Sequence, residues 1–292
     1  MKYSDRFFLL GDEWVYFKLF MGPKSLDDFI SIDLHYIIEA LETSNLIDEW
    51  FFIRYSYPSQ HLRLRFKLKF PKNLGEVINI INPYFKEYLR NDKIWKIQTD
   101  TYKREIERYG EDNYLVTEQI FHHDSYLVSS FLNCIYKNED YTIRWLFSLK
   151  ALDTLLTAFN YNLKEKLNLL SKIKSGFARE FQLDHFLKKQ IDKKYREYQE
   201  DIEGILEGGS FKVADNKIKI FLESYRLNIS TLALQVNQDR PMLDKLLSNY
   251  MHMTMNRLFK SKNRIYELLC YDFLSRYYKS KYVKCQKGIY ER

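Results

Sequence analysis

Cysteine, proline and glycine are scarce in this 292-residue sequence, which contains 3, 5 and 9 of them. The three cysteines, Cys134, Cys270 and Cys285, are widely spaced and form no CxxC pair. Because disulfide frameworks and zinc sites need cysteines or histidines at characteristic spacings, neither a disulfide-stabilised fold nor a metal site is expected. The hydrophobic content of 46%, together with so little proline and glycine, excludes a disordered chain.

Long apolar runs are also absent. No stretch of about 18 apolar residues occurs, so the sequence predicts no membrane-spanning helix. The opening MKYSDRFFLLGDEW has only a short apolar patch and no cleavage site after it, so no signal peptide is predicted. With reduced cysteines, these absences lead us to expect a cytoplasmic protein.

Charge is abundant but is not segregated. The sequence has 46 Lys and Arg against 39 Asp and Glu, which gives a formal net charge of +7. This balance favours anionic ligands, but the basic residues form no run, so a nucleic-acid module and direct tRNA binding are not expected. The motifs GxSxG, GxxxxGK[ST], HExxH and GxGxxG are missing, so the common hydrolase, nucleotide-binding and zinc-protease classes have no support.

The first part of the chain alternates strand and helix patterns. We expect strands at 14–20, 50–57, 61–70 and 94–102, and helices at 25–44 and 74–89. Gly22-Pro23 ends the first strand, and Ser25 with Asp27 marks the start of the first helix. The order β-α-β-β-α-β predicts a ferredoxin-like sandwich, in which helices cover one sheet face and leave the other free to bind.

From about residue 114 the hydrophobic periodicity is helical. We expect helices at 115–136, 141–159, 163–173, 177–207, 211–227, 242–259 and 264–278. Gly208-Gly209-Ser210 is the clearest internal break. The predicted fold class is α+β, with a ferredoxin-like region at 1–112 packed on a larger all-helical region at 113–292, as one continuous functional unit.

The segment HLRLRFKLKF at 61–70 alternates strictly between cationic and apolar residues. Because successive side chains of a strand point to opposite faces, one face carries His61, Arg63, Arg65, Lys67 and Lys69. Arginines two residues apart offer planar donors that suit a carboxylate or a phosphate, and an anion would relieve their mutual repulsion. A solvated sheet face with internal salt bridges is the alternative reading.

Two further segments carry candidate functional residues. In TYKREIERYG at 101–110, Glu105 and Arg108 follow the last predicted strand, and Gly110 permits a backbone turn; pairing among these charges as a surface network is the alternative. In NYMHMTMNRLF at 249–259, His252 and Asn256 fall on a second face of the helix, where a packing histidine is the alternative to a catalytic one.

Four segments together resemble the C-terminal domain of lantibiotic dehydratases, which also occurs as a separate chain in thiopeptide biosynthesis. They are WVYFKLF at 14–20, WFFIRYSYPSQHLRLRF at 50–66, TYKREIERYG at 101–110 with FHHDS at 121–125, and HMTMNRLF at 252–259. The resemblance covers nearly the whole chain, and the order and spacing of the motifs carry more weight than any one of them. One departure is Gly110-Glu111, where the family has two glycines.

The resemblance implies a lyase that eliminates glutamate from glutamylated Ser or Thr of a precursor peptide, leaving dehydroalanine or dehydrobutyrine. The residues that match the elimination site by motif position are Arg63, Arg65, Glu105, Arg108 and His252. The same motifs imply substrate contacts from His61, Arg54, Asn256 and Arg257. Cationic donors would stabilise the enolate that forms when the α-proton leaves, and His252 or Glu105 would transfer that proton.

The same resemblance implies partners. Because the chain is too short for a glutamylating domain, we expect a separate glutamylating dehydratase subunit that uses glutamyl-tRNA, with the glutamylated precursor peptide as substrate. No cofactor is expected, and a homodimer is left open.

Two other functions remain open from the sequence, and a tRNA-binding role, suggested by charge alone, is a third option. Within the same resemblance, the chain would join two dehydroalanines into a pyridine by [4+2] cycloaddition and release the leader peptide. As a non-catalytic recognition subunit, it would capture a peptide on the free sheet face or at an edge strand.

Overall fold

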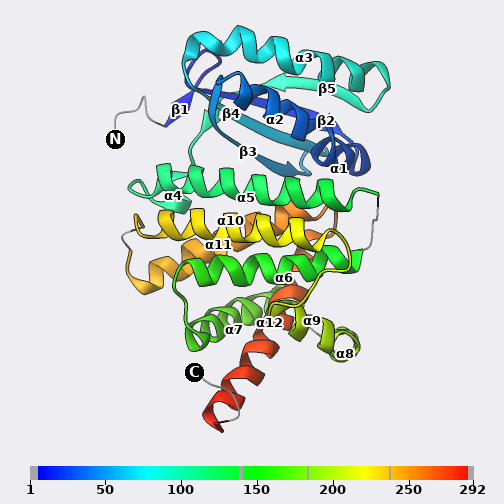
Figure 1. Ribbon diagram of the computed structural model, residues 1–292, viewed down its shortest axis with the longest axis vertical. Helices are drawn as coiled ribbons and strands as arrows, with labels where there is room; N and C mark the ends of the chain where they lie inside the picture. Colours follow the sequence, from blue (N-terminus) through cyan, green and yellow to red (C-terminus); the bar gives the residue numbers. More distant parts are fainter. Residues whose placement is uncertain (1–5, 138–140, 183, 237, 289–292) are drawn as a thin grey trace. The chain divides into compact units, whose positions relative to one another are not determined.

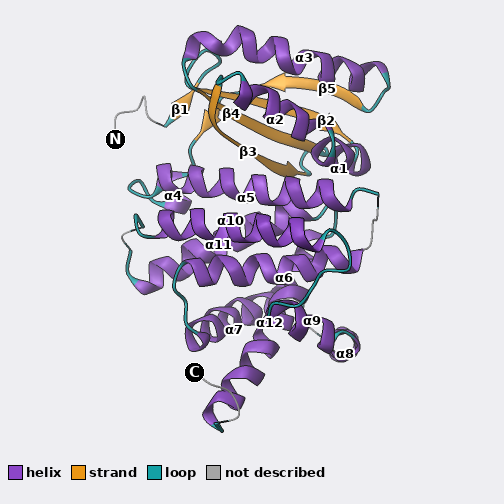
Figure 2. Ribbon diagram, viewed as in Figure 1, coloured by secondary structure: helices purple, strands orange, loops and turns teal. Residues whose placement is uncertain are grey.

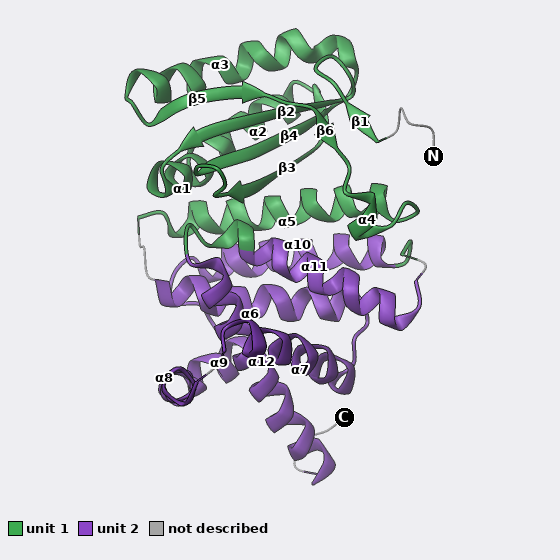
Figure 3. Cartoon of the chain, turned by 180° about the vertical axis from the view of Figure 1, so that it is seen from behind, with its two compact units in different colours: residues 1–139, 234–237, 256–261 green, residues 140–233, 238–255, 262–292 purple. Residues whose placement is uncertain are grey.

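The computed structural model describes residues 6–137, 141–182, 184–236 and 238–288. The chain forms two compact units (Figure 3). Unit 1 comprises residues 1–139, 234–237 and 256–261, and unit 2 comprises residues 140–233, 238–255 and 262–292. Among the described residues the last strand ends at Lys103 and only helices follow (Figure 2), so the predicted change from strands to helices near residue 112 is confirmed.

Unit 1 is built on a four-stranded antiparallel sheet with the strand order β3-β4-β2-β5. The strands are β2 Trp14–Met21, β3 Ile47–Tyr55, β4 His61–Leu68 and β5 Ile94–Thr99. Taken with the β-α-β-β-α-β order along the chain, this is the ferredoxin-like arrangement that the sequence predicted. The fold class, α+β, is likewise confirmed.

The helices α1 Pro23–Ser31, α2 Asp33–Thr43 and α3 Leu74–Arg90 lie on one side of this sheet (Figure 1). We predicted one helix at 25–44 with a cap at Ser25, and this was wrong. Gly22 is the N-cap and has no side chain that could cap the helix, and Pro23 in the first turn already has the φ that a helical residue needs. Ile32 then separates α1 from α2.

The strand predicted at 94–102 is shorter than expected. It ends at Thr99, and a separate two-stranded sheet pairs β6 Tyr102–Lys103 with β1 Phe7–Phe8. The short helix α4 Ile106–Tyr109 and the long helix α5 Tyr114–Ile135 follow, and α5 packs along β3.

The core of unit 1 lies between the sheet and its helices. Leu62, Leu64 and Phe66 of β4 are completely buried. Phe17 of β2 meets Phe85 of α3 edge to face, with ring centroids 5.7 Å apart. The apolar half of the alternating β4 pattern therefore forms the core, as predicted.

Side chains close the outer edge of β3, where another strand would otherwise pair. The N–H of Trp50 donates to Nδ1 of His122, and the N–H of Phe52 donates to the hydroxyl of Ser125. The C=O of Phe52 accepts from Nε of Arg257. The N–H and C=O of Arg54 both bond to the side-chain amide of Asn256. Burial lowers the pKa of His122 to about 4, so its ring is neutral and Nδ1 can accept the Trp50 N–H. An open edge of this kind is a template for pairing with another chain, and these contacts remove it.

Unit 2 is helical. Its helices are α6 Tyr141–Ala158, α7 Leu163–Glu180, α8 His185–Glu197, α9 Gln199–Leu206, α10 Asp215–Ala233, α11 Arg240–Leu258 and α12 Asn263–Gln286. The last residues of α11, from 256 onward, belong to unit 1. Helix α12 packs on α7 and α6, and α6 also packs on α10. No helix among the described residues combines the length and apolar character needed to cross a bilayer.

The helix boundaries of unit 2 differ from prediction in three places: α10 spans 215–233 instead of 211–227, α12 continues to 286 instead of 278, and the region 163–207 is divided differently. The expected helices at 163–173 and 177–207 are instead α7, α8 and α9. The predicted break at Gly208-Gly209 is confirmed. Gly208 has φ +95°, and a Cβ on Gly209 would lie 2.6 Å from the carbonyl oxygen of Gly204, so neither position suits a larger residue.

Replacement of Asn256 by Ala should lower the free energy of unfolding by about 2 kcal/mol, because the N–H and C=O of Arg54 both lose their side-chain partner. Asn249→Ala is a matched control on the same helix, since no side-chain hydrogen bond is shown for Asn249, and it should change stability by less than about 0.5 kcal/mol. Urea denaturation measures both. Equal effects of the two substitutions would mean that the β3 edge does not depend on this amide.

Candidate functional site

The cationic face of β4 continues across the sheet. Tyr16 and Lys18 of β2 lie opposite Arg65 and Arg63, so all four side chains share that face. Helices α1, α2 and α3 cover the other face, and the view from behind shows β2, β4 and β3 on the uncovered side (Figure 3). The predicted alternation therefore holds, but the face is not evenly solvated: Arg65 is only 6% exposed.

Arg65 is a buried cation inside an aromatic box. Its guanidinium carbon lies 4.2 Å from the ring centre of Tyr16, 4.8 Å from that of Tyr102 and 5.1 Å from that of Phe51. Its Nε and Nη1 have no hydrogen-bond partner, and the described residues provide no ion-pair partner for it. Ring faces attract a cation but do not neutralise it, so this group is suited to receive an anion.

Arg63 is partly exposed and is held by its neighbours. Its guanidinium stacks on Tyr55, with 3.5 Å between the guanidinium carbon and the ring centre, and its Nε donates to Nε2 of His61 at 3.2 Å. Nδ1 of His61 lies 2.8 Å from the carbonyl of Ser59 and therefore carries the proton. Burial lowers the pKa of His61, and the charge of Arg63 adds to this, so His61 is a neutral support for Arg63.

Glu105 and Arg108 lie at α4 and form a pair. Nη1 of Arg108 is 3.3 Å from Oε2 of Glu105, and both side chains are about half exposed. The backbone N–H of Glu105 donates to the hydroxyl of Tyr114, which is 3.2 Å from that of Tyr102 in the Arg65 box. The turn that follows uses Gly110 at φ +83°, as predicted.

The neighbouring Arg104 has a different role, which the sequence did not distinguish. Its Nε and Nη2 donate to the two oxygens of Glu118 at 2.8 and 2.6 Å, and both residues are buried. Glu107 pairs with Arg6. The surface network that was the alternative reading therefore describes Glu105 and Arg108, whereas Arg104 forms part of the interior.

In unit 2, a buried acid holds His252 of α11. Nδ1 of His252 is 3.0 Å from Oε1 of Glu267 in α12, and Glu267 is 1% exposed. Arg264 donates to the other oxygen of Glu267 at 2.8 Å. A carboxylate on Nδ1 fixes the tautomer of the imidazole and leaves Nε2 for proton transfer. Glu267 gave no sign in the sequence, because it comes from another helix.

Arg54, Asn256 and Arg257 lie among contacts of the fold. Arg54 is on the helix-covered face, where its Nη2 is 2.6 Å from Asp27 of α1. Arg257 is completely buried and its Nη1 is 2.7 Å from Asp124. Together with Asn256 they hold the β3 edge, and we leave these three expected substrate contacts out of the proposed site.

The structure thus brings His61, Arg63 and Arg65 together on one sheet face. Glu105 and Arg108 adjoin the Tyr102–Tyr114 side of the Arg65 box, and His252 belongs to unit 2. Among the described residues, no three His, Cys, Asp or Glu side chains gather in a way that would hold a metal ion.

The chain thus joins a ferredoxin-like sheet with a cationic face to a helical unit. Residues 14–278 match the family model for the C-terminal part of the lantibiotic biosynthesis dehydratase. The chain belongs to this family.

The curated relatives are much longer proteins. The chain is 22% identical over 264 residues to the subtilin biosynthesis protein SpaB of Bacillus subtilis. This match covers 88% of the chain and 24% of SpaB. It is 28% identical over 183 residues to the nisin biosynthesis protein NisB of Lactococcus lactis subsp. lactis. This match covers 61% of the chain and 18% of NisB. The chain therefore spans about a quarter or less of their lengths.

Solved structures show the same fold. The tRNA dependent lantibiotic dehydratase MibB from Microbispora sp. 107891 matches with a TM-score of 0.71 and 22% identity, over 92% of this chain and 28% of MibB. The pyridine synthase TbtD from thiomuracin biosynthesis matches with a TM-score of 0.59 and 14% identity, over 92% of this chain and 98% of TbtD. The fold thus occurs both within longer chains and in chains of similar length.

Two neighbouring arginines should respond differently to substitution by Met. Arg104→Met leaves Glu118 buried without its bidentate partner and should cost about 3 kcal/mol of unfolding free energy. Arg108→Met removes a half-exposed pair and should cost less than about 1 kcal/mol. Chemical denaturation of both variants tests the contrast. A loss of stability in Arg108→Met as large as that in Arg104→Met would contradict it.

Proposed function

We propose that this chain eliminates glutamate from glutamylated Ser or Thr residues of a ribosomal precursor peptide. The reaction breaks the Cα–H bond and the Cβ–O bond of the esterified residue, and it forms a Cα=Cβ double bond. The proton goes to a base of the protein, and the electrons of the Cβ–O bond leave with the glutamate carboxylate. The products are glutamate and dehydroalanine or dehydrobutyrine, so no oxidant or reductant is needed.

The observation that carries this proposal is the buried Arg65, for which the described residues provide no anionic partner. Burial of an isolated charge costs several kcal/mol, so a protein retains such a group where a ligand completes it. A glutamylated peptide supplies anions at two stages, the glutamyl carboxylate on binding and the enolate during reaction. A guanidinium that is already desolvated and fixed stabilises such charge without reorganising.

Arg63 and Arg108 extend the same chemistry. Arg63 has its guanidinium plane fixed by Tyr55 and His61, which favours bidentate contact with a carboxylate. Among the described residues, the half-exposed Glu105 is the one ion-pair partner of Arg108, so an entering carboxylate can exchange with it. We assign both arginines to recognition of the glutamyl group.

We assign proton transfer to His252, with Glu267 as the residue that positions it. An imidazole held on Nδ1 by a buried carboxylate has the arrangement of a base and its orienting acid. Glu105 lacks such support, because its carboxylate is exposed and bound to Arg108.

The proposal also includes the source of the substrate. This part of the proposal is supported by the match to MibB, a tRNA dependent lantibiotic dehydratase of which the chain covers 28%. We propose that a separate dehydratase subunit, using glutamyl-tRNA, esterifies the precursor peptide before this chain acts on it.

The direct test incubates a glutamylated precursor peptide with this chain alone and follows the products by mass spectrometry. We expect release of glutamate with a dehydrated residue left in the peptide. Arg65→Met should lower kcat/KM by about 100-fold, because the desolvated cation is lost. Lys69→Met removes a charge just past the end of the same strand and should leave the rate unchanged.

Three results would overturn the proposal. They are hydrolysis of the ester back to Ser or Thr, an unchanged glutamylated peptide, and formation of a pyridine from a peptide that carries two dehydroalanines without any glutamyl loss. The first two point away from elimination, and the third identifies the cycloaddition instead. An active Arg65→Met variant would remove the argument built on the aromatic box.

Substitution of the positioning residue tests the role of His252. Glu267→Gln should lower kcat by about 100-fold with little change in KM, because the amide no longer fixes a proton-accepting imidazole. Glu180→Gln alters the exposed partner of Arg264 and should leave kcat unchanged. Thermal unfolding of both variants separates lost folding from lost catalysis. An unchanged kcat in a folded Glu267→Gln protein would exclude this role.

A further inference from the structure

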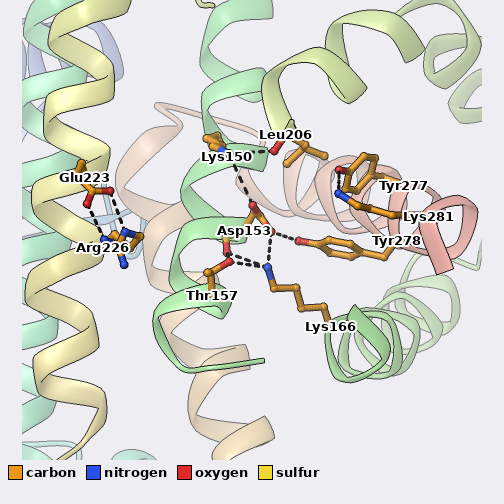
Figure 4. A network of polar contacts seen from close by, with 10 residues as sticks. All are labelled: Lys150, Asp153, Thr157, Lys166, Leu206, Glu223, Arg226, Tyr277, Tyr278 and Lys281. Atoms are coloured by element: carbon orange, nitrogen blue, oxygen red, sulfur yellow. Dashed lines mark hydrogen bonds and ion pairs between the residues drawn. The ribbon is translucent and has the colours of Figure 1, made fainter. Parts of the chain in front are cut away.

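The polar groups around Asp153 in unit 2 find their partners within the fold (Figure 4). Asp153 accepts from Nζ of Lys166 at 2.6 Å and from the hydroxyl of Tyr278. Nζ of Lys150 donates to the carbonyl of Leu206 at 3.0 Å. A ligand would have to displace these contacts to bind there. The sheet of unit 1 has, in contrast, an edge whose backbone groups are free to bind a partner.

This edge is the outer side of β5, the last strand of the sheet on the side away from β3. In an antiparallel pair, the backbone groups of alternate residues point toward the partner strand, and those of the residues between point away from it. The N–H of Asp100 donates to the carbonyl of Tyr16, one step beyond the Phe17–Thr99 pair of the β2–β5 register. The N–H and C=O groups of Ile97 and Thr99 therefore point away from β2.

The outer edge of β5 is open. Among the described residues, no strand or side chain bonds to the outward backbone groups of Ile97 and Thr99. Side chains close the opposite edge, on β3. Lys96 and Thr99 are exposed, and the side chain of Trp95 is 57% exposed. An edge of this kind is a template on which a further strand can pair.

The same edge is cationic. Residues 90–99 contain Arg90, Lys93 and Lys96 against a single acid, Asp92. In the described parts of the chain, none of the three cations takes part in an ion pair, and each lysine lies over an aromatic ring of the fold. Ring faces attract a cation but do not neutralise it. The charge of this edge is therefore available to an anionic partner.

Charge and composition together indicate what kind of strand fits. Like charges on paired strands destabilise the pairing, so a second copy of β5, which carries the same lysines, is disfavoured, and an acidic strand is favoured. Lysines alone would serve to keep other strands away from an open edge. Trp95 beside them has the opposite effect, because an exposed indole gains free energy when a partner covers it.

We propose that an acidic, extended segment of the precursor peptide binds as an added strand on the outer edge of β5. Its backbone pairs with Ile97 and Thr99, and its acidic side chains lie near Lys96. Lys96 is opposite Phe20 and thus shares the sheet face of Arg65. The identity of the occupant rests on the proposed function, whereas strand addition itself does not require the elimination.

The position of the added strand sets its distance from the cationic face of β4. Neighbouring strands lie about 4.8 Å apart, and β2 and β5 separate the added strand from β4, so the distance is about 14 Å. About four extended residues span it. The bound segment is therefore separate from the Ser or Thr that reacts, and it holds the peptide while that residue reaches Arg65.

Trp95 reports on this binding by its fluorescence, because the other three tryptophans are each 1% exposed. The probe is a synthetic eight-residue peptide of alternating valine and glutamate, blocked at both ends. We expect it to shift the emission to the blue and to protect Trp95 from acrylamide. The same peptide with alternate backbone nitrogens methylated should bind at least about tenfold more weakly, because it keeps its charge but loses main-chain hydrogen bonds. Replacement of its glutamates by lysines should weaken binding as much.

Substitutions at Thr99 give the matched pair of variants. Thr99→Pro removes an outward N–H, which an edge strand tolerates, and it should weaken peptide binding by about tenfold. Thr99→Ala keeps that N–H and should bind as the wild type does. With the glutamylated precursor as substrate, Thr99→Pro should raise KM by about tenfold and leave kcat unchanged. Thermal unfolding checks that both variants are folded.

Several results would overturn the inference. Equal binding of the methylated and unmethylated peptides would exclude strand addition, and so would equal effects of the two Thr99 variants. Sedimentation that shows a dimer in which Trp95 is already protected would give the edge to a second copy of the chain. An unchanged KM in Thr99→Pro would show that the precursor does not use this edge. Because the synthetic peptide carries no ester, failure of the elimination leaves the binding result unaffected.

Discussion

The sheet of unit 1 depends on the closing of the outer edge of β3. An edge strand presents N–H and C=O groups that must find partners, and no neighbouring strand supplies them here. His122 and Ser125 of α5, with Asn256 and Arg257 at the end of α11, take that place. A segment far along the chain thereby becomes part of unit 1, and the strand next to Arg63 and Arg65 is fixed.

The charged residues of unit 1 divide into two kinds by their partners. Arg54 and Arg104 each have a buried carboxylate within 2.6 Å, so their charges are used within the protein. Arg65 is equally buried, yet rings surround it instead of acids, and Arg108 has only an exposed partner. A charge that the fold leaves uncompensated is available to a ligand, and this difference separates the candidate site from the framework around it.

The sequence predicted helices and strands well where the hydrophobic periodicity was unambiguous. The alternation of His61–Leu68 placed every side chain of β4 on its correct face, because a strand has a strict period of two. The break at Ile32 and the division of 177–207 were missed, since a helical pattern continues through a kink or a short turn. The pairing of β6 with β1 was also missed, because two strands of two residues have no detectable pattern.

The sequence by itself determined the fold class, the strand order of a ferredoxin-like sheet, and which residues of β4 form the cationic face. These depend on local periodicity and turn chemistry, which neighbouring residues encode. Only the tertiary structure decided which arginines are used internally and that Glu267 holds His252, because those pairs join residues on different elements. Motif position gave Arg65 a role in the elimination and Arg54 a substrate contact, and only the structure shows that Arg54 is paired with the buried Asp27.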